Sequence, residues 1–247
     1  MSPISSILLD DLAPEQPSKI TQLYRYLELF SEGDPARHSL FVMGRDPAGE
    51  DQLLLIDPPV DVATRFRLTG QVAATFTAEP ATVDVPLVQT LPGGVAHLRI
   101  GEHFVDLYTQ SQGAVAHLPA LGVLCSGRFG SDVTVPTLAP DGDGSEELAT
   151  LRLLARLIKQ RRLQVMIPRV GSLATETPSA MRRLAEDVAY LHRLQRVTSP
   201  MAHDLTDLMH MAETLLPAER RTDRAWADHR ANLSRLHGYY ATQGPEH

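Results

Sequence analysis

The chain has very little cysteine: Cys125 is the single one in 247 residues. This excludes an internal disulfide and a zinc site made of several cysteines, and it suits a reducing compartment. No segment approaches the roughly 20 consecutive apolar residues that a membrane helix needs, and the N-terminus lacks the basic segment of a signal peptide. We therefore expect a cytoplasmic protein with no membrane partner.

Positive charge is also scarce, since 23 Lys and Arg residues stand against 30 Asp and Glu, for a formal net charge of -7. Such a chain has no long-range attraction for polyanions. The densest basic group, Lys159, Arg161 and Arg162, lies at the end of a predicted helix, where cations already stabilise the helix dipole. We therefore expect no nucleic-acid partner.

Familiar catalytic and nucleotide-binding motifs are missing as well. The sequence contains no GxSxG, as in serine hydrolases, and neither GxxxxGK[ST] nor GxGxxG, as in phosphate-binding loops. The glycines at positions 142 and 144 fit none of these patterns. Function must therefore be sought in less regular groups of residues.

What is present first is a series of short β-type runs between residues 38 and 137, separated by Gly, Pro and Asp. Such runs are typical of strands joined by tight loops. GRDPAGEDQ, after the first run, predicts a hairpin turn. Ahead of them, residues 17–32 carry apolar side chains at three- and four-residue steps, which indicates a short amphipathic helix or an extended packing segment.

Helical signals follow in the second half of the chain. Leucines at helical spacing predict a helix that Ser145 caps and that reaches Ile158, and residues 162–172 read as a buried strand and loop. Thr177 and Pro178 start a helix to about residue 196, and two more are predicted over 199–216 and 218–240. Strands first and helices last predict an α/β or α+β fold with helices packed outside a mixed sheet.

The order of these elements over residues 38–196 resembles that of metallo-β-lactamase-like hydrolases. HSLFVM and QLLLIDPP are similar to the opening strand pair, and Asp57 matches the Asp that ends it. RLQVMIPRVGS resembles the last strand and its Pro-Gly-His-Gly loop, with Pro168 and Gly171 retained.

The resemblance implies an α/β fold: a four-layer αββα sandwich over residues 1–198. Additional C-terminal helices over residues 199–247 would pack on it or on a partner.

The same resemblance implies that the metal ligands have been replaced. The HxHxDH motif of the superfamily is absent; Gln110 and Val170 match two loop histidines, and Arg128 matches the Asp that bridges two metals. None of the three is a usual zinc ligand, and Arg128 is permanently charged. We expect no metal and no cofactor, and a relic pocket formed by Asp57, Gln110, Arg128, Arg169 and Val170, in which Arg128 could pair with Asp57.

Other reactive side chains are interpreted first as structural. Cys125 would need a partner such as His117 to act as a nucleophile, and strand alternation favours a buried packing residue instead. His97 and His103 flank a predicted hairpin turn, where their imidazoles could approach each other, but two ligands do not complete a metal site.

The C-terminal helices carry two further groups. His203, Asp207 and His210 share one helix face, a spacing that suits a metal site or, more simply, a solvated stripe. The last helix has a polar group and an apolar stripe, and the stripe predicts packing or dimerisation. The polar group is Asp223, Asp228 and His229; the stripe is Trp226, Leu233, Leu236 and Tyr240.

These features favour a metal-free, non-hydrolytic pseudoenzyme that works as a binding or protein-interaction module. Arg128 and Arg169 would suit an anionic small ligand or a carboxylate of a protein partner, and the C-terminal helices are the expected surface for a homodimer or another partner. One alternative is a hydrolase of an ester, thioester or phosphoester with a rebuilt metal site or a metal-independent mechanism. Another is a helical partner-binding protein in a larger assembly, with the sheet domain as its scaffold.

Overall fold

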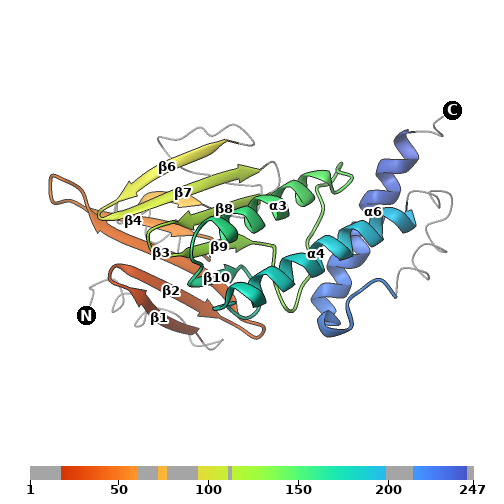
Figure 1. Ribbon diagram of the computed structural model, residues 1–247, viewed down its shortest axis with the longest axis horizontal. Helices are drawn as coiled ribbons and strands as arrows, with labels where there is room; N and C mark the ends of the chain where they lie inside the picture. The colour runs from red at the N-terminus through yellow and green to blue at the C-terminus, as the bar shows by residue number, and fades with distance from the viewer. Residues whose placement is uncertain (1–17, 60–71, 77–93, 111–112, 199–213, 244–247) are drawn as a thin grey trace.

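Two five-stranded sheets pack face to face in the computed structural model, which describes residues 18–59, 72–76, 94–110, 113–198 and 214–243 (Figure 1). The first sheet has the order β1-β2-β3-β4-β5, and all neighbours are antiparallel except β4 and β5. Its strands are β1 (Ser18–Tyr24), β2 (Leu27–Glu32), β3 (Arg37–Arg45), β4 (Asp51–Ile56) and β5 (Val72–Phe76).

The second sheet has the order β10-β9-β8-β7-β6 and is antiparallel except for the pair of β9 and β10. Because β9 and β10 are parallel, a crossover must join them, and α3 lies in that connection. The strands are β6 (Val95–Ile100), β7 (His103–Gln110), β8 (Gly113–Leu118), β9 (Val123–Gly127) and β10 (Val165–Pro168).

Strand alternation divides the apolar side chains between two layers. In β9, Val123 and Cys125 face the first sheet, whereas Leu124 points the other way, toward the helices. Leu54 in β4 joins the same core between the sheets, and its neighbour Leu53 lies on the outer face of the first sheet. A period of two residues therefore fixes the register of both sheets.

The helices cover the outer face of the second sheet (Figure 1). Leu154 of α3 and Leu191 of α4 are both buried, and each such side chain contributes about 1.5–3 kcal/mol on burial. The helical elements are α3 (Ser145–Gln160), α4 (Thr177–Thr198), the 3-10 turn η1 (Ala218–Arg220) and α6 (Asp223–Gln243).

The last helix packs on its own chain. Leu233 and Leu236 are buried in the cluster that α3 and α4 form, and Trp226 and Tyr240 pack against it. The apolar stripe predicted for this helix is therefore used within the chain. The division into units at residue 198 stays a prediction.

The predicted α/β sandwich with C-terminal helices is confirmed, as are the hairpin between β3 and β4 and the helices that begin near residues 145 and 177. One open alternative is decided and one local prediction is wrong. Residues 18–32 form the hairpin of β1 and β2, so the extended alternative is confirmed and the helical one is not; Leu27 and Leu29 point to the same core, as alternate residues of a strand do. Ser145 does not cap α3: the N-cap is Gly144, whose φ of 91° favours glycine.

Some predictions fall beyond the described residues. The group His203, Asp207 and His210 lies outside them, as does most of the helix predicted over 199–216. In the described part of the chain no helix covers the outer face of the first sheet, so the fourth layer is not seen there. Nor is any helix within the described ranges both long and apolar enough to cross a bilayer.

Candidate functional site

The carboxyl ends of β9 and β10 meet at one edge of the second sheet, because these strands are parallel neighbours. Arg128 directly follows β9, and Arg169 and Val170 follow β10. The Arg169 N–H donates to the Gly127 carbonyl at 2.7 Å, and the Arg169 carbonyl accepts from the His38 N–H at 2.8 Å. The loop after β10 is thus tied to both sheets.

The turn at Gly171 holds this loop in place. Its φ is 107°, and a Cβ there would lie 2.3 Å from Asp132 Oδ1, so only glycine fits. The Ser172 N–H donates to Asp132 Oδ1 at 2.8 Å, and Arg183 Nη1 donates to the Ser172 carbonyl at 2.6 Å. His38 adds a contact between its Nε2 and the Gly171 carbonyl at 2.6 Å.

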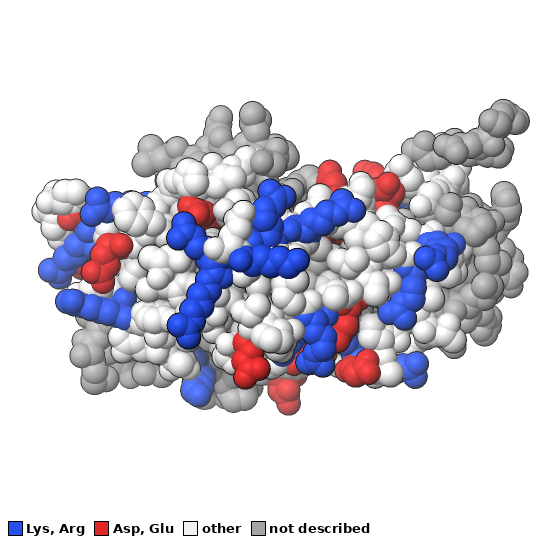
Figure 2. Space-filling view, in the orientation of Figure 1, with Lys and Arg blue, Asp and Glu red and all other residues white. Residues whose placement is uncertain are grey.

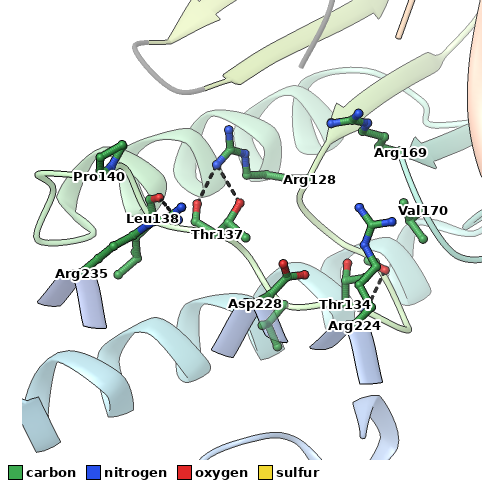
Figure 3. Close-up of a pocket in the computed structure, with 13 residues that line it drawn as sticks. Arg128, Thr134, Thr137, Leu138, Pro140, Arg169, Val170, Arg224, Asp228 and Arg235 are labelled. Atoms are coloured by element: carbon green, nitrogen blue, oxygen red, sulfur yellow. Dashed lines mark hydrogen bonds between the residues drawn. The ribbon is translucent and has the colours of Figure 1, made fainter. Parts of the chain in front are cut away.

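A pocket of about 270 Å³ opens at this edge (Figure 3). Its walls are the two strand-end loops, the segment from residue 131 to 140 and one face of α6. The charged lining residues are Arg128, Arg169, Arg224, Asp228 and Arg235. Among the described lining side chains, four guanidinium groups therefore stand beside one carboxylate.

Only part of the predicted relic pocket lines this space. Arg128, Arg169 and Val170 do so. Asp57 is buried beside Cys125 rather than in the lining, and its carbonyl accepts a hydrogen bond from Ser39 Oγ at 2.7 Å. The backbone of Gln110 ends β7, paired with Gly113, and its side chain lies outside the described structure.

Arg128 is held by the pocket wall. Its Nη1 donates to the carbonyl and to Oγ1 of Thr137, both at 2.8 Å (Figure 3). Behind that wall the Glu147 carboxylate accepts from the Ala139 N–H at 2.8 Å, and burial raises the pKa of Glu147 against the opposing charge of Arg128. The guanidinium is therefore positioned by the segment after it.

The opposite wall is fixed by α6. Asn232, fully buried, accepts from the Leu138 N–H at 2.8 Å and donates to the Pro136 carbonyl at 2.7 Å. Arg235 Nη1 donates to the Leu138 carbonyl at 2.6 Å. These bonds clamp the segment from 134 to 140 to the helix, so this wall of the pocket depends on α6 being docked.

Asp228 is the one acidic group among the lining side chains that the structure describes. Burial raises its pKa, and the nearby charges of Arg224, Arg235 and Arg128 oppose that rise. In Figure 3, Arg224 and Asp228 point from α6 toward the loops that carry Arg128 and Arg169. The pocket therefore presents positively charged hydrogen-bond donors around one carboxylate acceptor.

Sequence reasoning did not connect α6 with this site. Along α6, Asp228 follows Arg224 by four residues, and Arg235 follows Asp228 by seven. This spacing places all three side chains on nearly the same face of the helix. The stripe of Trp226, Leu233 and Leu236 lies on a different side. This spacing is visible in the sequence. It indicates a binding site only once this face of α6 is known to meet the ends of β9 and β10.

The described residues that line this pocket do not fit a divalent metal. Zinc needs several converging imidazole, thiolate or carboxylate ligands, whereas the described lining offers a single carboxylate beside four guanidinium groups, three hydroxyl groups and apolar side chains. Elsewhere in the described ranges, no three His, Cys, Asp or Glu side chains come together in a way that could hold a metal ion.

The other candidate residues are separated by the fold. Cys125 lies in the core between the sheets, and His117 sits on the opposite face beside Leu157 and Arg161, so the histidine cannot activate the thiol. Burial also raises the pKa of the Cys125 thiol, which disfavours its ionised form. His97 Nδ1 contacts Asp106 at 2.7 Å, whereas His103 Nε2 contacts the Arg25 carbonyl at 3.0 Å; the two imidazoles have different partners.

A second basic region lies outside the pocket. Figure 2 shows Lys and Arg side chains gathered over α3, where Arg152, Arg156 and Lys159 are exposed. These side chains are solvated and share no wall with the pocket. They provide a control for effects of charge alone.

The comparisons with known proteins concern the fold. No family model matches the chain, and no curated protein matches it. Among solved structures, a β-lactamase domain protein from Burkholderia ambifaria has a TM-score of 0.55 at 12% identity, over 96% of this chain and 92% of its own. The sec-alkylsulfatase Pisa1 from Pseudomonas sp. has a TM-score of 0.60 at 12% identity, over 93% of this chain, which spans 51% of the sulfatase.

A metallo-β-lactamase from Pontibacter korlensis is also similar, with a TM-score of 0.44 at 14% identity over 68% of this chain and 99% of its own. The class of protein that the two sheets and their helices define is an α/β sandwich. More particularly, the chain has the metallo-β-lactamase fold.

Proposed function

We propose that the protein is a binding module of the metallo-β-lactamase fold whose pocket at the strand ends holds a small anionic ligand. The observation that carries this proposal is the lining of four arginines around one aspartate in a concave space of about 270 Å³. Guanidinium groups form paired, charge-assisted hydrogen bonds with carboxylate and phosphate oxygens. They cannot take up a proton-transfer role, because they stay protonated.

The test is calorimetric titration with phosphate, sulfate and succinate at low ionic strength, where exposed charges are least screened. The variant R128Q/R169Q removes both arginines of the strand-end loops, and R152Q/R156Q removes two exposed arginines of α3 as a matched control. We expect the first to weaken anion binding about tenfold or more, because each lost charged hydrogen bond costs about 1.5–3 kcal/mol. The control should bind as the wild type does.

Two outcomes would contradict the proposal. One is that no small anion binds; the other is that both double variants lose affinity equally, which would indicate unspecific attraction. The alternative, a hydrolase, is tested with nitrophenyl esters, a thioester and a phosphodiester, with and without added zinc, manganese or iron. Turnover that R128Q/R169Q abolishes would favour the hydrolase over the binding module.

A further inference from the structure

We propose that the ligand of this pocket is a phosphomonoester that carries a hydroxyl or amino group close to its phosphate, and that α6 supplies part of the recognition. This inference rests on the proposed function, because it assumes that the pocket binds an anion. It adds the chemical class of the ligand and gives a role to Arg224 and Asp228.

The charge of the pocket favours a dianion. Among the described lining side chains one carboxylate stands against four guanidinium groups, so this lining attracts a dianion more strongly than a monoanion. A phosphomonoester carries about -1.5 to -2 at pH 7 and has three strong acceptor oxygens. A sulfate monoester or a carboxylate carries only one negative charge and balances less of it.

The directions from which the arginines come favour a tetrahedral group. Arg128 and Arg169 belong to the strand-end loops, whereas Arg224 and Arg235 come from α6 on another wall (Figure 3). A planar carboxylate offers its oxygens in a single plane and suits one guanidinium fork. A phosphate offers oxygens in several directions and can bridge the two walls.

Asp228 indicates what lies beside the phosphate. The charges of Arg224, Arg235 and Arg128 oppose that of Asp228. A carboxylate still repels a bound anion, and a hydrogen-bond donor on the ligand would offset that repulsion. An ionised carboxylate accepts hydrogen bonds and donates none. A hydroxyl or ammonium group next to the phosphate would supply that donor, and Asp228, four residues from Arg224 on α6, lies within the same wall.

The size of the pocket sets an upper limit. About 270 Å³ is near the lower end of the 300–1,000 Å³ that is usual for sites of small molecules. Such a space fits a small metabolite better than a strand of nucleic acid.

The ligand class is tested by calorimetry with glycerol phosphate, methyl phosphate, methyl sulfate and acetate. We expect glycerol phosphate to bind about tenfold more tightly than methyl phosphate, because its hydroxyls can donate to Asp228. Methyl phosphate should bind more tightly than methyl sulfate. This difference in affinity should grow as the pH rises through about 6, where the phosphomonoester takes its second charge.

The role of α6 is tested with R224A and D228N, and the matched control is R230A, which removes an exposed arginine of the same helix outside the pocket. R224A should weaken phosphate binding about tenfold, and R230A should leave it unchanged. D228N should strengthen methyl phosphate binding and reduce the advantage of glycerol phosphate, because the repulsion and the acceptor charge disappear together.

The outcomes separate the two proposals. If no anion binds the wild type, both fail. If acetate and methyl sulfate bind as tightly as the phosphates, or if D228N leaves the advantage of glycerol phosphate over methyl phosphate undiminished, the ligand class is wrong while anion binding stands. If R224A binds phosphate like the wild type although R128Q/R169Q does not, the contribution of α6 is refuted.

Discussion

The buried ion pair of Arg220 and Asp187 offers a sharp test of how α6 is anchored. Arg220 is 1% exposed and Asp187 is fully buried. Arg220 Nη1 pairs with Asp187 Oδ1 and donates to the Thr134 carbonyl at 3.2 Å. Asp187 Oδ2 also accepts from the Gly130 N–H at 2.7 Å. This pair joins η1, α4 and the segment that forms the pocket wall.

Arg220→Met would leave a buried carboxylate without its counterion, and we expect the free energy of unfolding to fall by about 3–5 kcal/mol. Asp187→Asn keeps an acceptor for the Gly130 N–H, and added to Arg220→Met it removes the uncompensated charge. The double variant should therefore be about 1–3 kcal/mol more stable than Arg220→Met alone.

Urea unfolding, followed by the fluorescence of the single tryptophan, Trp226, measures this effect. Trp226 lies in α6 and packs on the helical cluster, so its signal reports the docking of that helix. Arg221→Met, which changes the exposed neighbouring residue, is the matched control. The pair does not anchor α6 as argued if the stability losses of Arg220→Met and Asp187→Asn simply add in the double variant. The same holds if Arg220→Met lowers the free energy of unfolding by less than about 1 kcal/mol.

Two further predictions follow from buried titratable groups. Because burial raises the pKa of Cys125, a thiol reagent should label it only after denaturant is added; labelling of the folded protein at the same rate would contradict its burial. Burial lowers the pKa of His38, so the unfolded state takes up the proton first and stability should fall as the pH drops below about 6.5. His38→Gln should flatten that slope by at most about 1.4 kcal/mol per pH unit; an unchanged slope in urea unfolding would refute this.

The parts of the fold that the sequence predicted are those with a clear period. Alternation along β9 and leucines at helical spacing in α3 each reflect a single buried face, and the structure uses both as expected. Residues 18–32 were ambiguous because apolar steps of three and four also arise when two short strands meet at a tight turn. There Tyr26, with a φ of 62°, reverses the chain.

The site was predictable only in part, for a different reason. Arg128 and Arg169 follow neighbouring parallel strands, so their proximity could be inferred from local order. Arg224 and Arg235 reach the same pocket from the far end of the chain. Their approach depends on where α6 docks, and Asn232 and Arg220 set that position through bonds to carbonyls and carboxylates that no local pattern indicates.

The family resemblance implies that Arg128 replaces a carboxylate that bridges two metals, and such an exchange would change what this edge of the fold can do. A bound metal ion lowers the pKa of water and can generate a hydroxide. A guanidinium group has no open coordination site, but it keeps its charge at every physiological pH and adds directed hydrogen bonds. On the proposed function, positive charge at the ends of β9 and β10 then depends on the chain alone. Anion affinity should accordingly be the same before and after treatment with a chelator.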